Sequence, residues 1–123
     1  MEAPLDSTAR ALHSLRDIQG VYGSFILNGA GEPTARDLPA VFDARTLLES
    51  GLRITRLWEV VSENTEPEFA LLEFAEYSLF LRAVPKGCLC VVVPSHVNVL
   101  ALRQASKWVA RQLEPVAAKA HPA

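Results

Sequence analysis

The sequence is poor in the residues that mark several large classes of protein. Its 123 residues include only two cysteines, Cys88 and Cys90, separated by one residue. A secreted disulfide scaffold has more cysteines at wider spacing, so we expect a reducing compartment, the cytoplasm. The longest apolar run, Cys88 to Val93, is far too short to cross a membrane. The first 20 residues also lack the apolar block of a signal peptide.

An excess of positive charge is missing as well. The chain has 12 basic and 14 acidic residues, which give a formal net charge of −2. Proteins that bind nucleic acid or anionic lipid usually carry a basic excess. The composition therefore argues against a nucleic-acid partner and against membrane insertion or docking.

No catalytic or cofactor-binding pattern stands out. Residues 29–31 (Gly-Ala-Gly) lack the third glycine and the helix start of a dinucleotide-binding loop, so they indicate a hairpin turn. Cys88 and Cys90 are better explained as small buried hydrophobic residues than as metal ligands, because the three histidines are scattered along the chain. Ser95 and His96 are adjacent and cannot easily adopt nucleophile–base geometry.

Two further polar groups have simple structural explanations. Ser95 or Asn98 can cap the last expected helix. A set of acidic residues between 63 and 76 lacks the spacing of a calcium loop and is typical of a solvated rim. We therefore expect no cofactor, no metal ion and no catalytic residue.

What the sequence does contain is apolar surface, because half of its residues are hydrophobic. We expect one domain over residues 1–123, with an ordered core from about 5 to 114 and a frayed tail from 116. A small chain this apolar often buries part of its surface in an oligomer interface.

The periodicity of apolar residues predicts an α+β protein. Pro33 marks its second strand as an edge or irregular strand, and Asp37 is a plausible cap for its long helix. The expected order is helix, strand, strand, helix, strand, strand, strand, helix, over residues 4–19, 21–27, 32–37, 39–61, 68–74, 77–84, 87–93 and 98–113.

Two of these strands are apolar on both faces. The strand over 87–93 should lie centrally in the sheet, with a layer of structure on each side. The strand over 68–74 would be an unusually adhesive edge if it lay at the border of the sheet.

The long helix over 39–61 is apolar over about half of its circumference, wider than the stripe of an ordinary surface helix. Gly51 in its middle either allows another backbone to approach closely or marks a break between two helices. A helix this apolar contacts more than one neighbour.

The opposite side of that helix mixes charged and apolar residues, which is typical of an interface. The alternative is a solvated face in which Arg45 and Glu49 form a helical ion pair. The residues that we predict to bind a partner protein are Phe42, Arg45, Glu49, Arg53 and Arg56.

The chain resembles the roadblock/dynein light chain family over residues 5–114. The likeness rests on residues 18–31 (IQGVYGSFILNGAG), which are similar to the opening helix, Gly-Val and strand of that family. It rests equally on residues 89–103 (LCVVVPSHVNVLALR), which are similar to its last strand and the Pro, Asn and Arg that lead into the last helix.

The resemblance implies a five-stranded antiparallel sheet with the long helix on one face and the two terminal helices on the other. It also implies a dimer, with this chain or a paralogous roadblock protein, formed through the long helix and the strand after it. The interface residues expected on this basis are Leu47, Leu48, Gly51, Leu52, Trp58, Phe69 and Leu71.

The function implied by the resemblance is non-catalytic regulation or scaffolding of a Ras-like small GTPase. A bacterial branch of the family acts in cell polarity and gliding motility. An adaptor that binds another roadblock protein or a response-regulator-type partner, without contacting the GTPase, is the alternative. A small enzyme that uses Cys88, Cys90 or His96 is a third hypothesis.

Overall fold

The computed structural model describes residues 7–39, 44–85 and 87–113. Its helices and strands follow one another in the predicted order, with a short 3-10 turn, η1, after the first helix. The elements are α1 (Ser7–Ser14), η1 (Leu15–Asp17), β1 (Gly23–Asn28), β2 (Pro33–Asp37), α2 (Ala44–Ser62), β3 (Ala70–Glu73), β4 (Ser78–Val84), β5 (Gly87–Val93) and α3 (Val99–Gln112).

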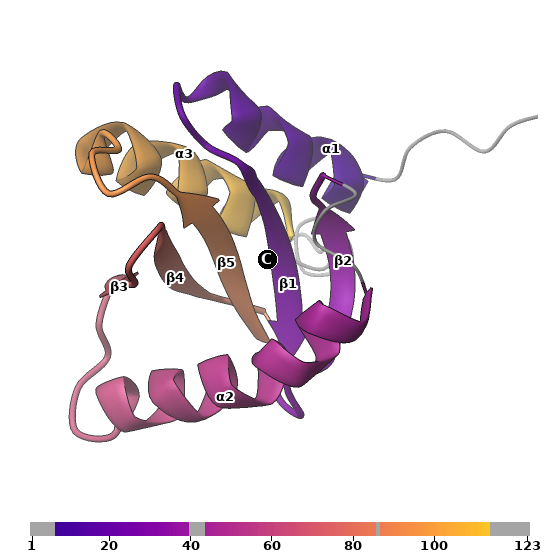
Figure 1. Cartoon of the computed structure of the whole chain (residues 1–123), viewed down its shortest axis with the longest axis vertical. Helices are drawn as coiled ribbons and strands as arrows, with labels where there is room; N and C mark the ends of the chain where they lie inside the picture. The colour runs from indigo at the N-terminus through magenta and orange to yellow at the C-terminus, as the bar shows by residue number, and fades with distance from the viewer. Residues whose placement is uncertain (1–6, 40–43, 86, 114–123) are drawn as a thin grey trace, which may run out of the picture.

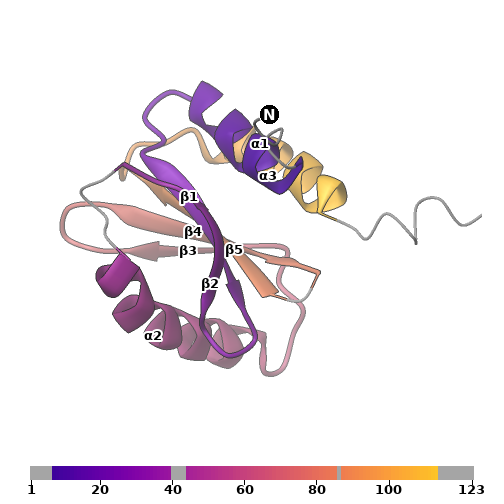
Figure 2. The ribbon, with the colours of Figure 1, turned by 90° about the vertical axis from the view of Figure 1, so that its right-hand side faces the viewer.

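The strands form one five-stranded sheet in the order β2-β1-β5-β4-β3, and every neighbouring pair is antiparallel. Helix α2 covers one face of the sheet, and α1 and α3 lie side by side on the other (Figures 1 and 2). The predicted α+β fold class is therefore confirmed. The edge position expected for the strand that contains Pro33 is confirmed as well.

Strand β5 organises the core because both of its faces are buried. Leu89, Val91 and Val93 pack with the residues of α1 and α3, whereas Cys88, Cys90 and Val92 pack on the side of α2. Both cysteines are free and buried, and burial raises the pKa of the Cys90 thiol well above its usual value. They act as small hydrophobic side chains, as predicted.

The last helix begins as its sequence predicts. Of the two candidate caps, Asn98 is the one used: its side-chain oxygen accepts a hydrogen bond of 3.0 Å from the backbone N–H of Ala101. No helix in the described ranges is both long and apolar enough to cross a bilayer.

The prediction that Asp37 caps the long helix is wrong. Asp37 pairs with Ser24 as the last residue of β2, and α2 starts only at Ala44. The Asp37 carboxylate instead accepts a 2.7 Å hydrogen bond from Nε of Arg16 and lies 3.4 Å from Nδ1 of His13. Residues 4–6, 40–43 and the expected tail from 116 lie outside the described residues.

Helix α2 packs closely against the turn between β1 and β2, where Gly51 of the helix contacts Gly31 of the turn. Gly51 is buried, and a Cβ atom placed on it would collide with the carbonyl oxygen of Gly31 and touch Leu27. Gly31 has a φ of +82°, a conformation that favours glycine. Of the two explanations offered for Gly51, close approach of a second backbone is therefore confirmed, since α2 continues unbroken through this position.

We predict that Gly51→Ala destabilises the protein by about 2 kcal/mol or more, although alanine is the better helix former, because the added methyl group displaces the hairpin. Gly29→Ala is the matched control: a Cβ atom there meets nothing within 4 Å. It should change the free energy of unfolding by less than about 0.5 kcal/mol. Urea denaturation of the two variants checks the prediction, and equal stabilities would contradict it.

Candidate interaction surface

The outward side of α2 carries the largest group of exposed apolar side chains on any one element of the described chain. Scattered apolar residues on a surface need no explanation, but several on one helix make that helix a candidate interaction surface. The exposed fractions are 69% for Val60, 58% for Leu48, 46% for Leu52, 44% for Leu57 and 39% for Val61.

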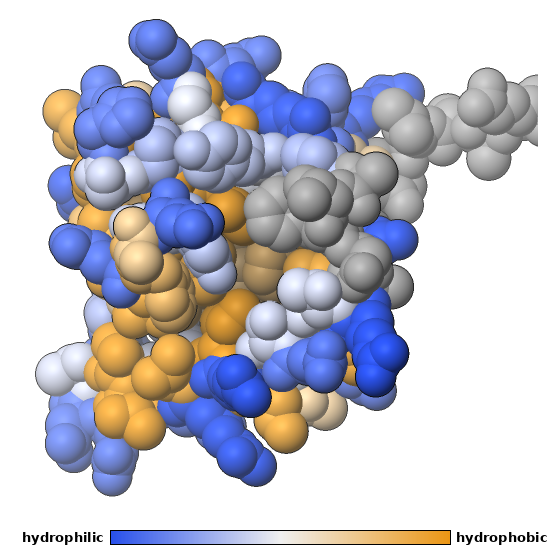
Figure 3. Space-filling view, in the orientation of Figure 1, coloured by the Kyte–Doolittle hydropathy of each residue, from blue (hydrophilic) through white to orange (hydrophobic). Residues whose placement is uncertain are grey.

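Most of these residues lie on two flanks of the helix because its inward side is fixed by Leu47, Gly51 and Ile54, which are buried. Leu48 and Leu52 lie on the flank toward the β1–β2 hairpin, where Leu52 contacts Gly31. Leu57 and Val61 lie on the other flank, and Val60 lies on the outermost side of the helix, between Glu49 and Arg53 in direction at about 100° per residue. Apolar side chains gather over the C-terminal half of α2 and over the adjacent sheet (Figure 3).

Charged side chains occupy the crest between the two flanks. Arg45, Glu49, Arg53 and Arg56, four of the predicted partner-binding residues, are all exposed there. Arg45 and Glu49 do not form the helical ion pair that was the alternative explanation, within the part of the chain that the structure describes. The fifth predicted residue, Phe42, lies outside the described residues.

Strand β3 forms the free edge of the sheet nearest the C-terminal end of α2. It pairs with β4 on one side only, and Ala70 and Leu72 pack on the face that α2 covers. Phe74, just beyond the strand, is 44% exposed and stacks on Tyr77. The outer edge of β3 has no partner strand among the described residues, so it can pair with another chain.

The predicted dimer-interface residues occupy three different environments. Leu48 and Leu52 are exposed on α2. Leu47 and Gly51 are buried on the side of α2 that faces the sheet, and Trp58 is half-buried against the sheet. Phe69 and Leu71 pack on the opposite face with α1 and α3, where the ring of Phe69 stacks on Phe80 at 5.0 Å.

The list of predicted interface residues does not include Leu57, Val60, Val61 and Phe74, which the structure exposes. Leu57 and Val60 belong to the side of the helix whose mixture of charged and apolar residues predicts an interface, and Phe74 follows the edge strand. An apolar residue in such a place has no core to join.

A cluster of charged side chains holds the residue just before β3, Glu68, against helix α3. The Glu68 carboxylate accepts hydrogen bonds from Nε of Arg103 at 2.6 Å and from Nη2 of Arg103 at 2.7 Å. Arg82, which is buried, donates to the same carboxylate at 3.1 Å and to the hydroxyl of buried Ser106 at 2.8 Å. The hydrogen bonds from Arg103 and Arg82 lower the pKa of Glu68 to about 2.

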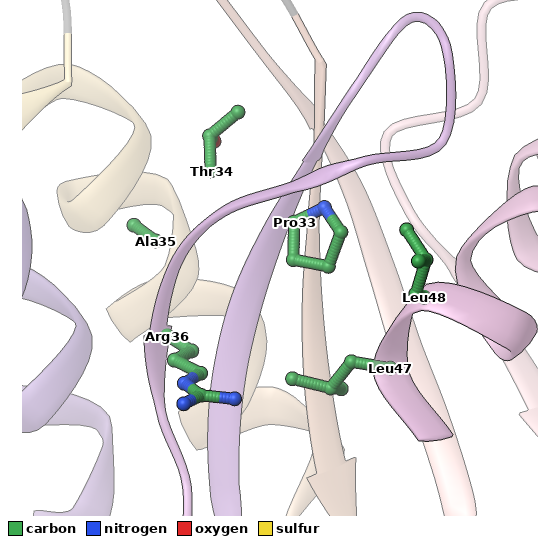
Figure 4. Close-up of a pocket in the computed structure, with 6 residues that line it drawn as sticks. All are labelled: Pro33, Thr34, Ala35, Arg36, Leu47 and Leu48. Atoms are coloured by element: carbon green, nitrogen blue, oxygen red, sulfur yellow. The ribbon is translucent and has the colours of Figure 1, made fainter. Parts of the chain in front are cut away.

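The described surface is hollowed beside the start of α2. One cavity of about 360 Å³ lies between β2 and the start of α2. Figure 4 shows its lining, in which Arg36 is the one charged residue among apolar and small side chains from Pro33 to Leu48. In the ranges that are described, no three His, Cys, Asp or Glu side chains come together in a metal-binding group.

The arrangement of this sheet and its three helices is that of the roadblock/LC7 domain. A crystal structure of a Roadblock/LC7 domain from Streptomyces avermitilis is similar with a TM-score of 0.75. The two sequences are 11% identical, and the match covers 87% of this chain and 94% of that chain.

Two MglB structures show the same fold. The gliding protein MglB from Thermus thermophilus is similar with a TM-score of 0.73 at 12% identity, covering 98% of this chain and 95% of that chain. An MglB with a tetrameric arrangement is similar with a TM-score of 0.71 at 13% identity, covering 98% and 95%. No protein-family model and no curated protein matches the sequence.

We predict that acid removes a contribution of Glu68 to stability. Its folded-state pKa of about 2 lies below the ordinary value of 4.5, so its stabilising effect is present above about pH 4.5 and is lost as the pH falls toward 2. Thermal unfolding should be measured for the wild type and for Glu68→Gln between pH 6 and pH 2. The wild type should unfold at the higher temperature at pH 6, and the difference between the two unfolding temperatures should shrink as the pH falls. A constant difference across that range would contradict the prediction.

Proposed function

We propose that this chain is a non-catalytic, dimer-forming regulator or scaffold of a Ras-like small GTPase in the cytoplasm. The observation that carries the proposal is the outward surface of α2, where exposed apolar residues and arginines lie together in a fold that MglB proteins share. Cell polarity or gliding motility is the process that the MglB likeness favours.

The dimer is proposed to form through the apolar part of that surface and the free edge of β3. A second copy of the chain, or a related roadblock protein, would cover Leu57, Val60 and Val61 with the same residues of its own α2. Pairing of two β3 strands would satisfy the open backbone groups of the edge and extend the sheet across both protomers. Together these contacts remove from water the apolar surface that a monomer leaves exposed.

The GTPase is proposed to bind the charged crest of α2, which both protomers of such a dimer present. Arg45, Arg53 and Arg56 are exposed on it, and each can donate several hydrogen bonds to acidic groups of a partner. Three similar arginines on one rigid helix mark no single residue as a catalytic arginine finger. Regulation would then act by arranging the GTPase's own residues.

We expect Leu57→Glu to weaken the dimer at least about tenfold, because a carboxylate would be buried at the centre of the contact. Leu100→Glu is the matched control: Leu100 is 63% exposed on α3, on the other face of the sheet. Sedimentation equilibrium of both variants measures the effect. Dissociation constants that change equally in the two variants would contradict the proposed interface.

We expect a nucleotide-dependent complex with a Ras-like GTPase. Small GTPases from the same source would be purified and loaded with GDP or a non-hydrolysable GTP analogue. Isothermal titration should show at least about tenfold tighter binding to one loaded form. Equal binding to both forms would instead favour the adaptor that binds without sensing the nucleotide.

Such a protein can stimulate GTP hydrolysis by supplying a catalytic arginine or by arranging the GTPase's own residues. Three variants distinguish the two: Arg45→Ala, Arg53→Ala and Arg56→Ala. Each variant should weaken binding in part, and no single variant should abolish stimulation of GTP turnover when the GTPase is saturated. Complete loss confined to one arginine would identify a catalytic finger and overturn the non-catalytic account.

A further inference from the structure

The exposed side of α3 is a second charged surface, on the face of the sheet opposite α2 (Figure 2). Within Val99–Gln112 the helix has three basic residues, Arg103, Lys107 and Arg111, and no acidic residue. They follow one another at intervals of four residues, so they form a stripe along one side of the helix. The net charge of −2 does not reveal this stripe, because acidic residues in other parts of the chain outnumber the basic ones.

Within the described ranges, most acidic residues lie far from this stripe in the sequence. Between residues 57 and 81 there are six acidic residues and no basic one, which separates the charges of the chain into regions. Of these six, only Glu68 reaches α3, where it binds Arg103. Lys107, Arg111 and the exposed Arg10 of the neighbouring α1 form no ion pair with any other described residue.

Two large apolar side chains accompany the stripe. Leu100 is 63% exposed and Trp108 is 48% exposed. Trp108 lies roughly 140° around the helix from Arg103, at about 100° per residue, and therefore on the flank nearer α1. A half-exposed tryptophan beside unneutralised basic groups is typical of the anchor residues of a binding surface.

The chain itself shows how this stripe binds a carboxylate. Arg103 holds Glu68 through two hydrogen bonds of 2.6 and 2.7 Å, in the bidentate geometry of an arginine–carboxylate pair. Lys107 and Arg111 continue the stripe, about 6 Å further along the axis for each interval of four residues. A ligand for them needs carboxylates at that spacing and an apolar side chain to cover Trp108.

We propose that the surface formed by Lys107, Arg111, Trp108 and Leu100 of α3 docks an acidic amphipathic segment of a partner protein. An amphipathic helix with Glu or Asp one turn apart has the required carboxylate spacing. Lys107 and Arg111, which have no ion-pair partner among the described residues, are fewer than the four to eight basic residues that typically hold a protein on anionic lipid, and the net charge of −2 opposes such binding. The surface lies apart from α2 and β3, so it stays open in the proposed dimer and does not depend on it.

The test uses a fluorescein-labelled helical peptide that repeats Glu-Ala-Gln-Leu, in which the Glu and Leu side chains share one side. Fluorescence anisotropy with the full chain should give saturable binding that weakens as salt rises. The same peptide with Gln in place of every Glu should bind at least about tenfold more weakly. Equal binding of the two peptides would overturn the proposal.

Three variants locate the binding site. Lys107→Glu/Arg111→Glu and, separately, Trp108→Ala should each weaken binding at least about tenfold. Arg36→Glu reverses a charge on β2, beside α2, at a residue with no proposed binding role, and is the control, which should change binding less than about twofold. The side chains changed in these variants are all exposed, and circular dichroism of each variant verifies folding.

The outcomes that overturn the proposal are distinct from one another. If reversal of Arg36 weakens binding as much as reversal on α3, the peptide binds through general charge and no site exists on α3. If phosphatidylserine vesicles bind the chain through Lys107 and Arg111 while the acidic peptide does not, the ligand is a lipid surface and the proposed partner is wrong. Failure of the chain to dimerise would leave this binding unchanged, since the site lies within one protomer.

Discussion

The contact between Gly51 and Gly31 is the constraint on which the rest of the structure depends. It brings the backbone of α2 against the turn of the β1–β2 hairpin and fixes how the helix is rotated about its axis. That rotation directs Leu47 and Ile54 into the core and leaves large apolar side chains such as Val60 in solvent. The proposed dimer surface is therefore a consequence of packing inside one protomer, because a rotation of the helix would bury one set of residues and expose another.

The sheet separates two surfaces of different chemistry. The α2 face has apolar flanks with a charged crest, next to a free strand edge, and suits extended contact with a similar protein. The α3 face presents a basic stripe with an aromatic anchor and suits a short acidic segment. Glu68, Arg82 and Arg103 connect the two, because they hold the residues before β3 against α3. If both proposed surfaces bind, the protein can hold two partners at once, as the proposed scaffold requires.

Local chemistry was enough to predict the order of the helices and strands, the resemblance to the roadblock family implied how they are arranged around the sheet, and long-range contacts decided the rest. The unbroken apolar run of β5 and the proline of β2 gave those strands their central and edge positions. In a strand with apolar residues on both faces, by contrast, the sequence does not show whether the odd-numbered or the even-numbered side chains face α2. The expectation therefore places Phe69 in the dimer interface, whereas in the structure it stacks on Phe80 on the side of α3. The apolar sector of α2 is so broad that the sequence likewise does not show which part of it faces the sheet. Glu68 and Arg103 are 35 residues apart in the chain, and nothing in the local sequence pairs them.

The central claim is that the outward apolar surface of α2 is covered by a second copy or a related chain. The most direct measurement is the mass of the purified protein in solution, by sedimentation equilibrium over a wide range of concentrations. The account predicts a particle of twice the chain mass of 13.5 kDa that dissociates only on dilution. A particle of 13.5 kDa that persists at high micromolar concentration, both alone and with roadblock proteins from the same source, would contradict it.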